Sequence, residues 1–306
     1  MRILPILMIT IVSALALSAC SQPYAGGVAG TYALDAVITN TNQDPYVVGL
    51  EDTDSITVSE ARFGVTCTAS GAAHLAALAP EPSRVALAYH GLDLARLPAP
   101  PARRAAGGPF VLLSVGRLVA KKGYDDLLAA LARLPADLDW RFRHVGGGDL
   151  SKALKAEAER RGLAGRIDWL GKRARDEVFA EMRAADLFVL PSKIAPGGDR
   201  DGLPNVLMEA ASQRLPILST AVSAIPEFAR DGVEARLVAP GDPAALAEAI
   251  AALAADAEGR ARLAEAAHAR LHAAFGMEPG IDVVAARLAA ALGEAAPAAP
   301  FRLAGE

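Results

Sequence analysis

The sequence is poor in cysteine and in aromatic residues. Only two of its 306 residues are cysteines, Cys20 and Cys67, and no CxxC pair is present. The five histidines form no HExxH motif, so we expect neither a metal site nor a bound cofactor. Aromatic residues make up 5 % of the chain, and alanine and leucine dominate its second half. This composition favours a helix-rich interior over an aromatic-rich β-sandwich.

An excess of positive charge is also absent. The formal net charge is −4, so no basic field covers the protein and no nucleic-acid partner is expected. Local basic residues can still bind a phosphate group. The length allows one large domain or two modest ones.

Residues 1–20 resemble a bacterial export signal. An apolar run over residues 3–17 has the length of such a signal and is short for a membrane span. Residues 17–20 read LSAC and resemble a lipobox, in which Cys20 would carry the lipid. The alternative is a buried first strand over residues 1–12 of a cytoplasmic Rossmann-type domain.

Between this segment and the regular part of the chain, organisation is weak. Residues 21–58 are loop-rich and have no assignment. Gly26-Gly27 is interpreted as a turn, with a phosphate-contacting loop as the alternative. Residues 85–89 predict a strand, and the prolines in residues 98–101 indicate an exposed linker.

From Gly107 onward, apolar runs alternate with helical periodicity. This alternation predicts an α/β fold with a doubly wound parallel sheet, whose ligands bind at the carboxyl ends of the strands. We expect strands at residues 109–115, 140–145, 167–170, 187–190, 217–219 and 235–238. We expect helices at residues 124–134, 150–161, 176–185, 203–213, 243–255, 257–274 and 281–292.

Basic residues follow the first of these strands. Gly116 and Arg117 close the strand, and Lys122 and Gly123 precede the next helix. Arg117 offers a planar fork for two phosphate oxygens, Lys122 offers a point charge, and the helix start adds partial positive charge. A basic pair in a loop is usually solvated surface, but its place after a buried strand favours a diphosphate site.

A glycine-rich turn follows the second strand. Residues 144–149 read HVGGGD, which is not the GxGxxG pattern of dinucleotide sites. The plain interpretation is a strand-to-helix turn. The functional one places Gly146 and Gly148 close to a bound nucleotide.

The most informative segment follows the fourth strand. Pro204 suits the first turn of a helix, so that Gly202 and Leu203 would present backbone N–H groups at its start. Asp201 precedes this helix and Glu209 lies about two turns into it. A carboxylate accepts two hydrogen bonds, so each can hold a vicinal diol of a sugar or ribose. The alternative is a helix cap and a surface charge.

A weaker signal comes last. Residues 219–220 carry two hydroxyls, and residues 225–227 read IPE. We interpret the segment as a strand, a turn and a short helix. The alternative is that its hydroxyls and amides contact the ligand.

In this order, over residues 63–291, the motifs resemble the family 4 retaining glycosyltransferases of the GT-B fold. Asp201 and Glu209 occupy the two ends of the family's E-x7-E motif, here D-x7-E. The resemblance implies that Glu209 binds the nucleotide ribose and Asp201 the donor sugar. It implies that Arg117 and Lys122 bind the diphosphate, and that residues 202–204 line the sugar-phosphate path.

The resemblance implies transfer of a sugar from a UDP- or GDP-linked donor with retention, assisted by the departing phosphate and without a protein nucleophile. It is nearest to exopolysaccharide and colanic-acid-type enzymes. A saccharide or lipid-linked acceptor is therefore expected. A functional enzyme is expected in the cytoplasm, and contact with the inner membrane is left open. The lipobox-like segment instead argues for export.

Several positions depart from the family pattern. Asp201 is shorter than glutamate. Arg214 stands where the family usually has glycine before the next strand, so it is a candidate for positive φ, and Ser223-Ala224 stands where a Gly-Gly pair is common. The family's acceptor domain takes about 170 residues, a full domain. Here a truncated or replaced acceptor domain is expected.

The number of residues that precede the regular region determines the domain organisation that we expect. We predict a signal at residues 1–20, an unassigned segment at 21–58, an acceptor-domain remnant and linker at 59–105, a donor-binding domain at 106–292, and a tail at 293–306. Two alternatives to an active enzyme follow: an inactive nucleotide-sugar-binding remnant, or an exported lipoprotein.

Overall fold

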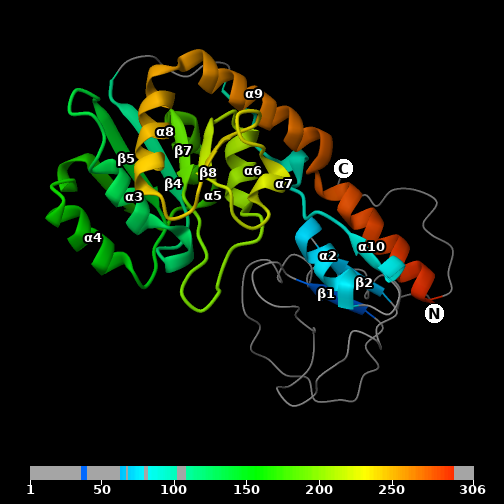
Figure 1. Ribbon diagram of the computed structural model, residues 1–306. Helices are drawn as coiled ribbons and strands as arrows, with labels where there is room; N and C mark the ends of the chain where they lie inside the picture. The colour runs from blue at the N-terminus through cyan, green and yellow to red at the C-terminus, as the bar shows by residue number, and fades with distance from the viewer. Residues whose placement is uncertain (1–35, 40–62, 67, 79–81, 102–107, 293–306) are drawn as a thin grey trace. The chain divides into compact units, whose positions relative to one another are not determined.

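A computed structural model describes residues 36–39, 63–66, 68–78, 82–101 and 108–292 (Figure 1). The chain divides into two compact units: Met1–His90 together with Glu278–Glu306, and Gly91–Met277. The LSAC segment with Cys20, the Gly26-Gly27 turn and the predicted tail lie outside the described residues.

The second unit contains a parallel six-stranded sheet with the strand order β6-β5-β4-β7-β8-β9. The order reverses beside β4, which is the mark of a doubly wound fold. The predicted fold class is therefore confirmed. The strands are β4 (Phe110–Val115), β5 (Trp140–Val145), β6 (Ile167–Gly171), β7 (Leu187–Leu190), β8 (Ile217–Thr220) and β9 (Arg236–Val238).

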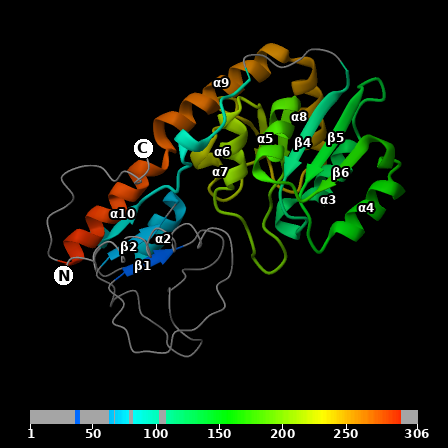
Figure 2. The same ribbon diagram turned by 180° about the vertical axis from the view of Figure 1, so that it is seen from behind.

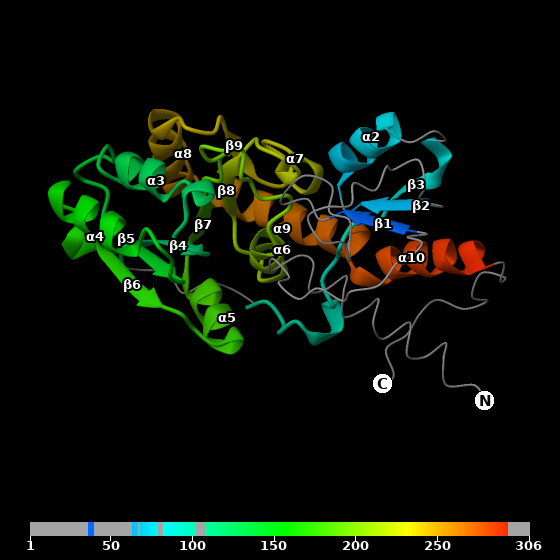
Figure 3. The ribbon, with the colours of Figure 1, turned by 90° about the horizontal axis from the view of Figure 1, so that it is seen from below.

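Helices cover both faces of this sheet, as Figures 2 and 3 show. One face carries α3 (Tyr124–Leu131), α4 (Ser151–Arg160) and α8 (Pro243–Ala255). The other face carries α5 (Arg175–Ala184), α6 (Asn205–Ser212) and α9 (Ala257–Ala274). The connections place every loop after a strand at one edge of the sheet.

The core lies between the sheet and its helices. Alternate residues of β4 point to opposite faces, and Leu112 and Leu113 are both fully buried. Leu112 joins a cluster with Leu128 of α3 and Ile250 of α8. All four residues of β7 are buried, because this strand lies in the middle of a covered parallel sheet.

Several predicted boundaries agree with the structure to the residue: the strands at 140–145 and 187–190, and the helices at 243–255 and 257–274. The placement of Pro204 in the first turn of α6 was wrong. Pro204 has φ −68° and ψ 122°, so it is the extended residue before the helix, which begins at Asn205. The fixed φ of proline suits both positions, and the sequence alone does not decide ψ.

The last helix begins earlier than predicted. We expected residues 281–292, but α10 spans Met277–Leu292. Pro279-Gly280 resembles a turn, yet proline is tolerated in a first helical turn. A Cβ at Gly280 would lie 2.4 Å from the backbone oxygen of Tyr89, so glycine is required there by close packing.

The first unit contains a three-stranded parallel sheet, β1 (Ala36–Thr39), β2 (Phe63–Thr66) and β3 (Val85–Leu87), in that order. Helix α2 (Ala69–Leu78) connects β2 to β3. Val65 and Ala88 pack against apolar residues of α10. The sequence interpretation missed β1, β2 and α2.

No helix in the described part of the chain is long and apolar enough to cross a membrane.

Candidate functional site

Three of the sequence motifs meet at the carboxyl ends of neighbouring strands. Gly116, Arg117 and Lys122 follow β4, Gly146 and Gly148 follow β5, and residues 191–204 follow β7. Strands β5, β4 and β7 are adjacent in the sheet. The structure therefore brings together segments up to 88 residues apart at the edge where doubly wound sheets bind ligands.

The glycines of the first two motifs permit close backbone contact. Gly146 has φ 138°, and a Cβ there would lie 2.0 Å from the backbone oxygen of Gly116. A Cβ at Gly148 would lie 2.6 Å from the backbone oxygen of Leu118. The backbone N–H of Leu118 donates to Gly147 O at 2.9 Å. The glycine-rich turn is thus built against the basic loop.

The basic loop also holds the segment after β7. Gly123 has φ 67°, and a Cβ there would lie 1.9 Å from Pro191 O. The Lys193 N–H donates to Lys121 O at 2.9 Å. The Lys193 ammonium lies 2.6 Å from Asp125 and 2.9 Å from Asp126, in the first turn of α3. The first residues after β7 are therefore held against the first turn of α3 by these contacts.

Lys122 and Asp201 form a close ion pair. Lys122 Nζ lies 2.6 Å from Asp201 Oδ2, and both side chains are at most one-tenth exposed. Lys121 lies 3.0 Å from Asp199 and 3.5 Å from Asp201, so two lysines and two aspartates form one network. The sequence interpretation named Lys122 and Asp201 but missed Lys121 and Asp199. The signal available in the sequence was a pair of lysines at residues 121–122 and a pair of aspartates within residues 199–201, which carry opposite charges.

Arg117 lies beside this network but is exposed at the end of β4. Among the described residues, no ion pair or side-chain hydrogen bond of Arg117 is found. Its guanidinium is therefore a cation available to an anionic ligand.

Glu209 lies on α6, and no ion pair with the described residues is found for its carboxylate. Burial raises the pKa of Glu209, and the charge of Arg175 opposes that shift. A half-buried carboxylate in this state can accept hydrogen bonds from a ligand. Between it and Asp201, the buried residues Gly202, Leu203 and Pro204 lead into α6.

The two hydroxyls of residues 219–220, in the last of the sequence motifs, donate hydrogen bonds within the protein. Ser219 Oγ donates to Leu190 O at 2.6 Å, and Thr220 Oγ1 donates to Ser192 O. Both side chains are fully buried. They tie β8 to the end of β7, so we do not assign them to a ligand.

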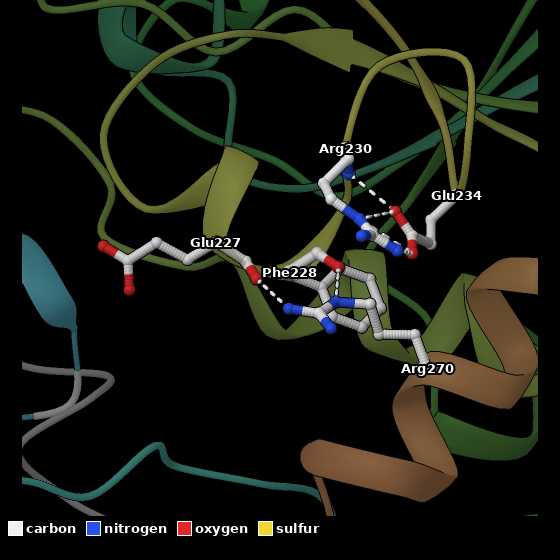
Figure 4. Close-up of polar contacts among 5 residues, drawn as sticks. All are labelled: Glu227, Phe228, Arg230, Glu234 and Arg270. Atoms are coloured by element: carbon white, nitrogen blue, oxygen red, sulfur yellow. Dashed lines mark hydrogen bonds and ion pairs between the residues drawn. The ribbon is translucent and has the colours of Figure 1, made fainter.

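The short helix α7 (Ile225–Phe228) follows, as predicted, and is held at its carboxyl end. Arg270 donates to Phe228 O at 2.8 Å and to Glu227 O at 2.7 Å (Figure 4). The buried Glu234 accepts hydrogen bonds from the backbone and side chain of Arg230. Cationic groups at helix carbonyls are stabilising, so this arrangement holds the carboxyl end of α7 and the turn that follows it.

Among the residues that the structure describes, two that are not glycine adopt the left-handed region of backbone conformation. Arg214 has φ 49° and Ser223 has φ 52°. Both were identified in the sequence as standing where glycine is common. The positive φ predicted for Arg214 is confirmed, and Ser223 has a positive φ as well.

His144, the first residue of the glycine-rich motif, is a core residue. Burial lowers its pKa to about 4, so it is neutral at pH 7. Its ring packs edge-on against Tyr124, with ring centroids 4.7 Å apart. In the described part of the chain, no group of three or more potential ligand side chains is placed to hold a metal ion.

Comparison with known proteins places these features in a family. Residues 99–270 match the model of the group 1 glycosyl transferases. Over 181 residues the chain is 34 % identical to WcaL of Salmonella typhimurium, described as a colanic acid biosynthesis glycosyltransferase. That match covers 59 % of this chain and 44 % of WcaL. The chain is also 35 % identical over 146 residues to AmsK of Erwinia amylovora, an amylovoran biosynthesis glycosyltransferase, covering 47 % of this chain and 36 % of AmsK. The chain thus spans less than half the length of these relatives.

Solved structures agree on the fold. The HepE structure from Anabaena, solved with UDP and glucose, superposes with a TM-score of 0.63 at 22 % identity, covering 75 % of this chain and 64 % of that one. The C-terminal domain of LpcC from Francisella tularensis superposes with a TM-score of 0.53 at 21 % identity, covering 60 % of this chain and 97 % of that domain. With the family model matching more than half of its residues, the chain belongs to the group 1 glycosyl transferases, which here have a GT-B-type α/β domain.

Proposed function

We propose that this protein is a glycosyltransferase whose unit Gly91–Met277 binds a UDP- or GDP-linked sugar. The observation that carries the proposal is that Arg117, the Lys122–Asp201 pair and the helix that bears Glu209 follow neighbouring strands at one edge of the sheet. The family match and the UDP-containing HepE structure support it. Transfer to a saccharide or lipid-linked acceptor, in exopolysaccharide or envelope glycan synthesis, is part of the proposal.

Arg117 and Lys122 have the chemistry that the leaving group needs. Negative charge develops on the diphosphate as the glycosidic bond breaks, and nearby cations lower that barrier. Arg117 is exposed and can form two parallel hydrogen bonds to phosphate oxygens. This stabilisation requires no metal ion.

The carboxylates suit the rest of the donor. Glu209 is the proposed acceptor for the ribose hydroxyls, and Asp201 for hydroxyls of the sugar. Asp201 reaches less far than glutamate does, so its contact depends on where the loop after β7 holds it. We propose retention at the anomeric carbon, as in family 4 enzymes, with the departing phosphate assisting attack and no nucleophile from the protein.

The compartment follows from the donor. Nucleotide sugars are cytoplasmic, so we propose that the protein acts there, with membrane contact through a lipid-linked acceptor.

The test is calorimetric titration of the full chain with UDP and with GDP, beside an assay of sugar release from their glucose and mannose conjugates. We expect binding of one nucleotide. Arg117→Ala should weaken it by about 10- to 100-fold, the value of a charge-assisted hydrogen bond. Glu209→Ala should also weaken it. Arg133→Ala is the matched control, because Arg133 is exposed just beyond the other end of α3.

The outcomes separate the alternatives. Binding with turnover supports the enzyme. Binding that depends on Arg117 and Glu209 but gives no turnover supports a nucleotide-sugar-binding protein without activity. Failure of both nucleotides to bind contradicts both.

A further inference from the structure

Lys121, Lys122, Asp199 and Asp201 form a compact cluster beside the proposed diphosphate site, called here the Lys–Asp cluster. Lys121 is its central member, because it contacts both aspartates, at 3.0 Å and 3.5 Å. Its side chain is only 6 % exposed, whereas that of Asp199 is 45 % exposed. Lys121 is therefore enclosed by protein and points toward carboxylates, not toward solvent.

The charges of the Lys–Asp cluster cancel in pairs. Lys122 contacts Asp201 alone, so without Lys121 the cluster would hold two carboxylates against one ammonium. Asp201 is only 9 % exposed, so its negative charge is weakly screened and, without Lys121, would oppose an incoming diphosphate. Asp201 would then keep Lys122 as its one ion-pair partner in the cluster, which would hold Lys122 more strongly and make it less able to turn toward a phosphate oxygen.

The backbone fixes Lys121 in this place. It lies in the 3-10 turn η4 (Ala120–Lys122), and its carbonyl accepts the N–H of Lys193 in the loop after β7. The same loop supplies both aspartates. Ala195 N–H donates to Asp199 O at 2.8 Å, which folds the loop back on itself. Lys121 thus joins the two loops by a backbone contact and by two ion pairs.

We propose that Lys121 is a positioning residue for the nucleotide-sugar site: it neutralises Asp199 and Asp201 and so leaves Lys122 available to the diphosphate. The inference rests on the proposed function, since it assumes a diphosphate ligand. Lys121 itself need not touch that ligand. Its contribution is the charge balance around Asp201 and the position of the loop.

Charge balance and simple packing predict different results for a double variant. Lys121→Met keeps much of the aliphatic stem but removes the charge. Asp199→Asn removes one negative charge from a half-exposed side chain, and Asn keeps the shape of Asp. If charge balance matters, Asp199→Asn should restore what Lys121→Met loses. If Lys121 acts only by packing, the double variant should bind no better than Lys121→Met.

The experiment is calorimetric titration of the full chain and these three variants with UDP and GDP, at low and high salt, with thermal unfolding of each. Lys121→Met should weaken nucleotide binding by about tenfold or more at low salt. Asp199→Asn alone should tighten it about threefold, and the double variant should return near wild type. The differences should shrink at high salt.

Besides a double variant that binds no better than Lys121→Met, two further results overturn the inference while leaving the proposed function intact. One is wild-type binding that is unchanged by Lys121→Met. The other is an Asp199→Asn protein that folds and binds no tighter than wild type, which decides the matter even where Lys121→Met fails to fold. A wild-type chain that binds neither nucleotide overturns the proposed function, and this inference with it.

Discussion

At the scale of single residues, Glu209 is a position where the carboxylate proposed to bind the ligand lowers the stability of the fold. Burial raises the pKa of its carboxyl group above the ordinary 4.5. A raised pKa means that the folded protein holds the proton more tightly than the unfolded chain does. Stability therefore rises as pH falls through this pKa, and at pH 7 the ionised carboxylate destabilises the fold.

Glu209→Gln should accordingly raise the free energy of unfolding at pH 7, by up to about 1 kcal/mol. The advantage over wild type should decrease as the pH is lowered toward 4.5, because wild-type Glu209 then becomes neutral as well. Nucleotide affinity should fall in the same variant. Urea unfolding at pH 7 and pH 5 measures the first effect. A variant that is less stable than wild type at pH 7 would contradict the burial argument.

Single residues also show where sequence reasoning ends. Arg117, Lys122, Asp201 and Glu209 could be chosen from the sequence, because each has a fixed place relative to a strand or helix. The contact of Lys121 with Asp199 could not, since it joins positions 78 residues apart. Only the packing of two loops determines which lysine faces which aspartate.

At the scale of elements, the strands and helices of Gly91–Met277 were predictable for physical reasons. Strands buried on both faces are continuous apolar runs, as in β7, and α8 begins at an aspartate cap followed by proline. Helix α2 lacked such signals. Its sequence, ASGAAHLAAL, has no acidic residue in its first turn and no basic one in its last.

The turn between η4 and α3 provides a prediction at this scale. Gly123→Ala should destabilise the protein by at least about 2 kcal/mol, because φ is 67° and the new Cβ would collide with Pro191 O. Gly165→Ala is the control, since nothing lies within 4 Å of a Cβ there and its φ is not positive. It should change stability by less than about 1 kcal/mol. Thermal unfolding of both variants tests this, and equal melting temperatures would refute the close approach.

At the scale of the whole molecule, the described part of the chain contains two parallel sheets, one of six strands and one of three. The elements assigned to the proposed site all belong to the unit Gly91–Met277, which contains the whole of the family match. Of the described strands of the smaller sheet, β3 was expected from the sequence at residues 85–89, whereas β1 and β2 were missed. The residues proposed for donor recognition all lie in the larger unit.

The most direct test of the account is hydrogen–deuterium exchange of the full chain with and without saturating UDP or GDP. Bound nucleotide should slow exchange in two segments distant in sequence, residues 115–123 and 199–209, because both contribute to one site. Arg117→Ala should remove this protection at the same nucleotide concentration. Protection confined to other segments, or none with either nucleotide, would contradict the claim that these loops form a nucleotide-sugar site.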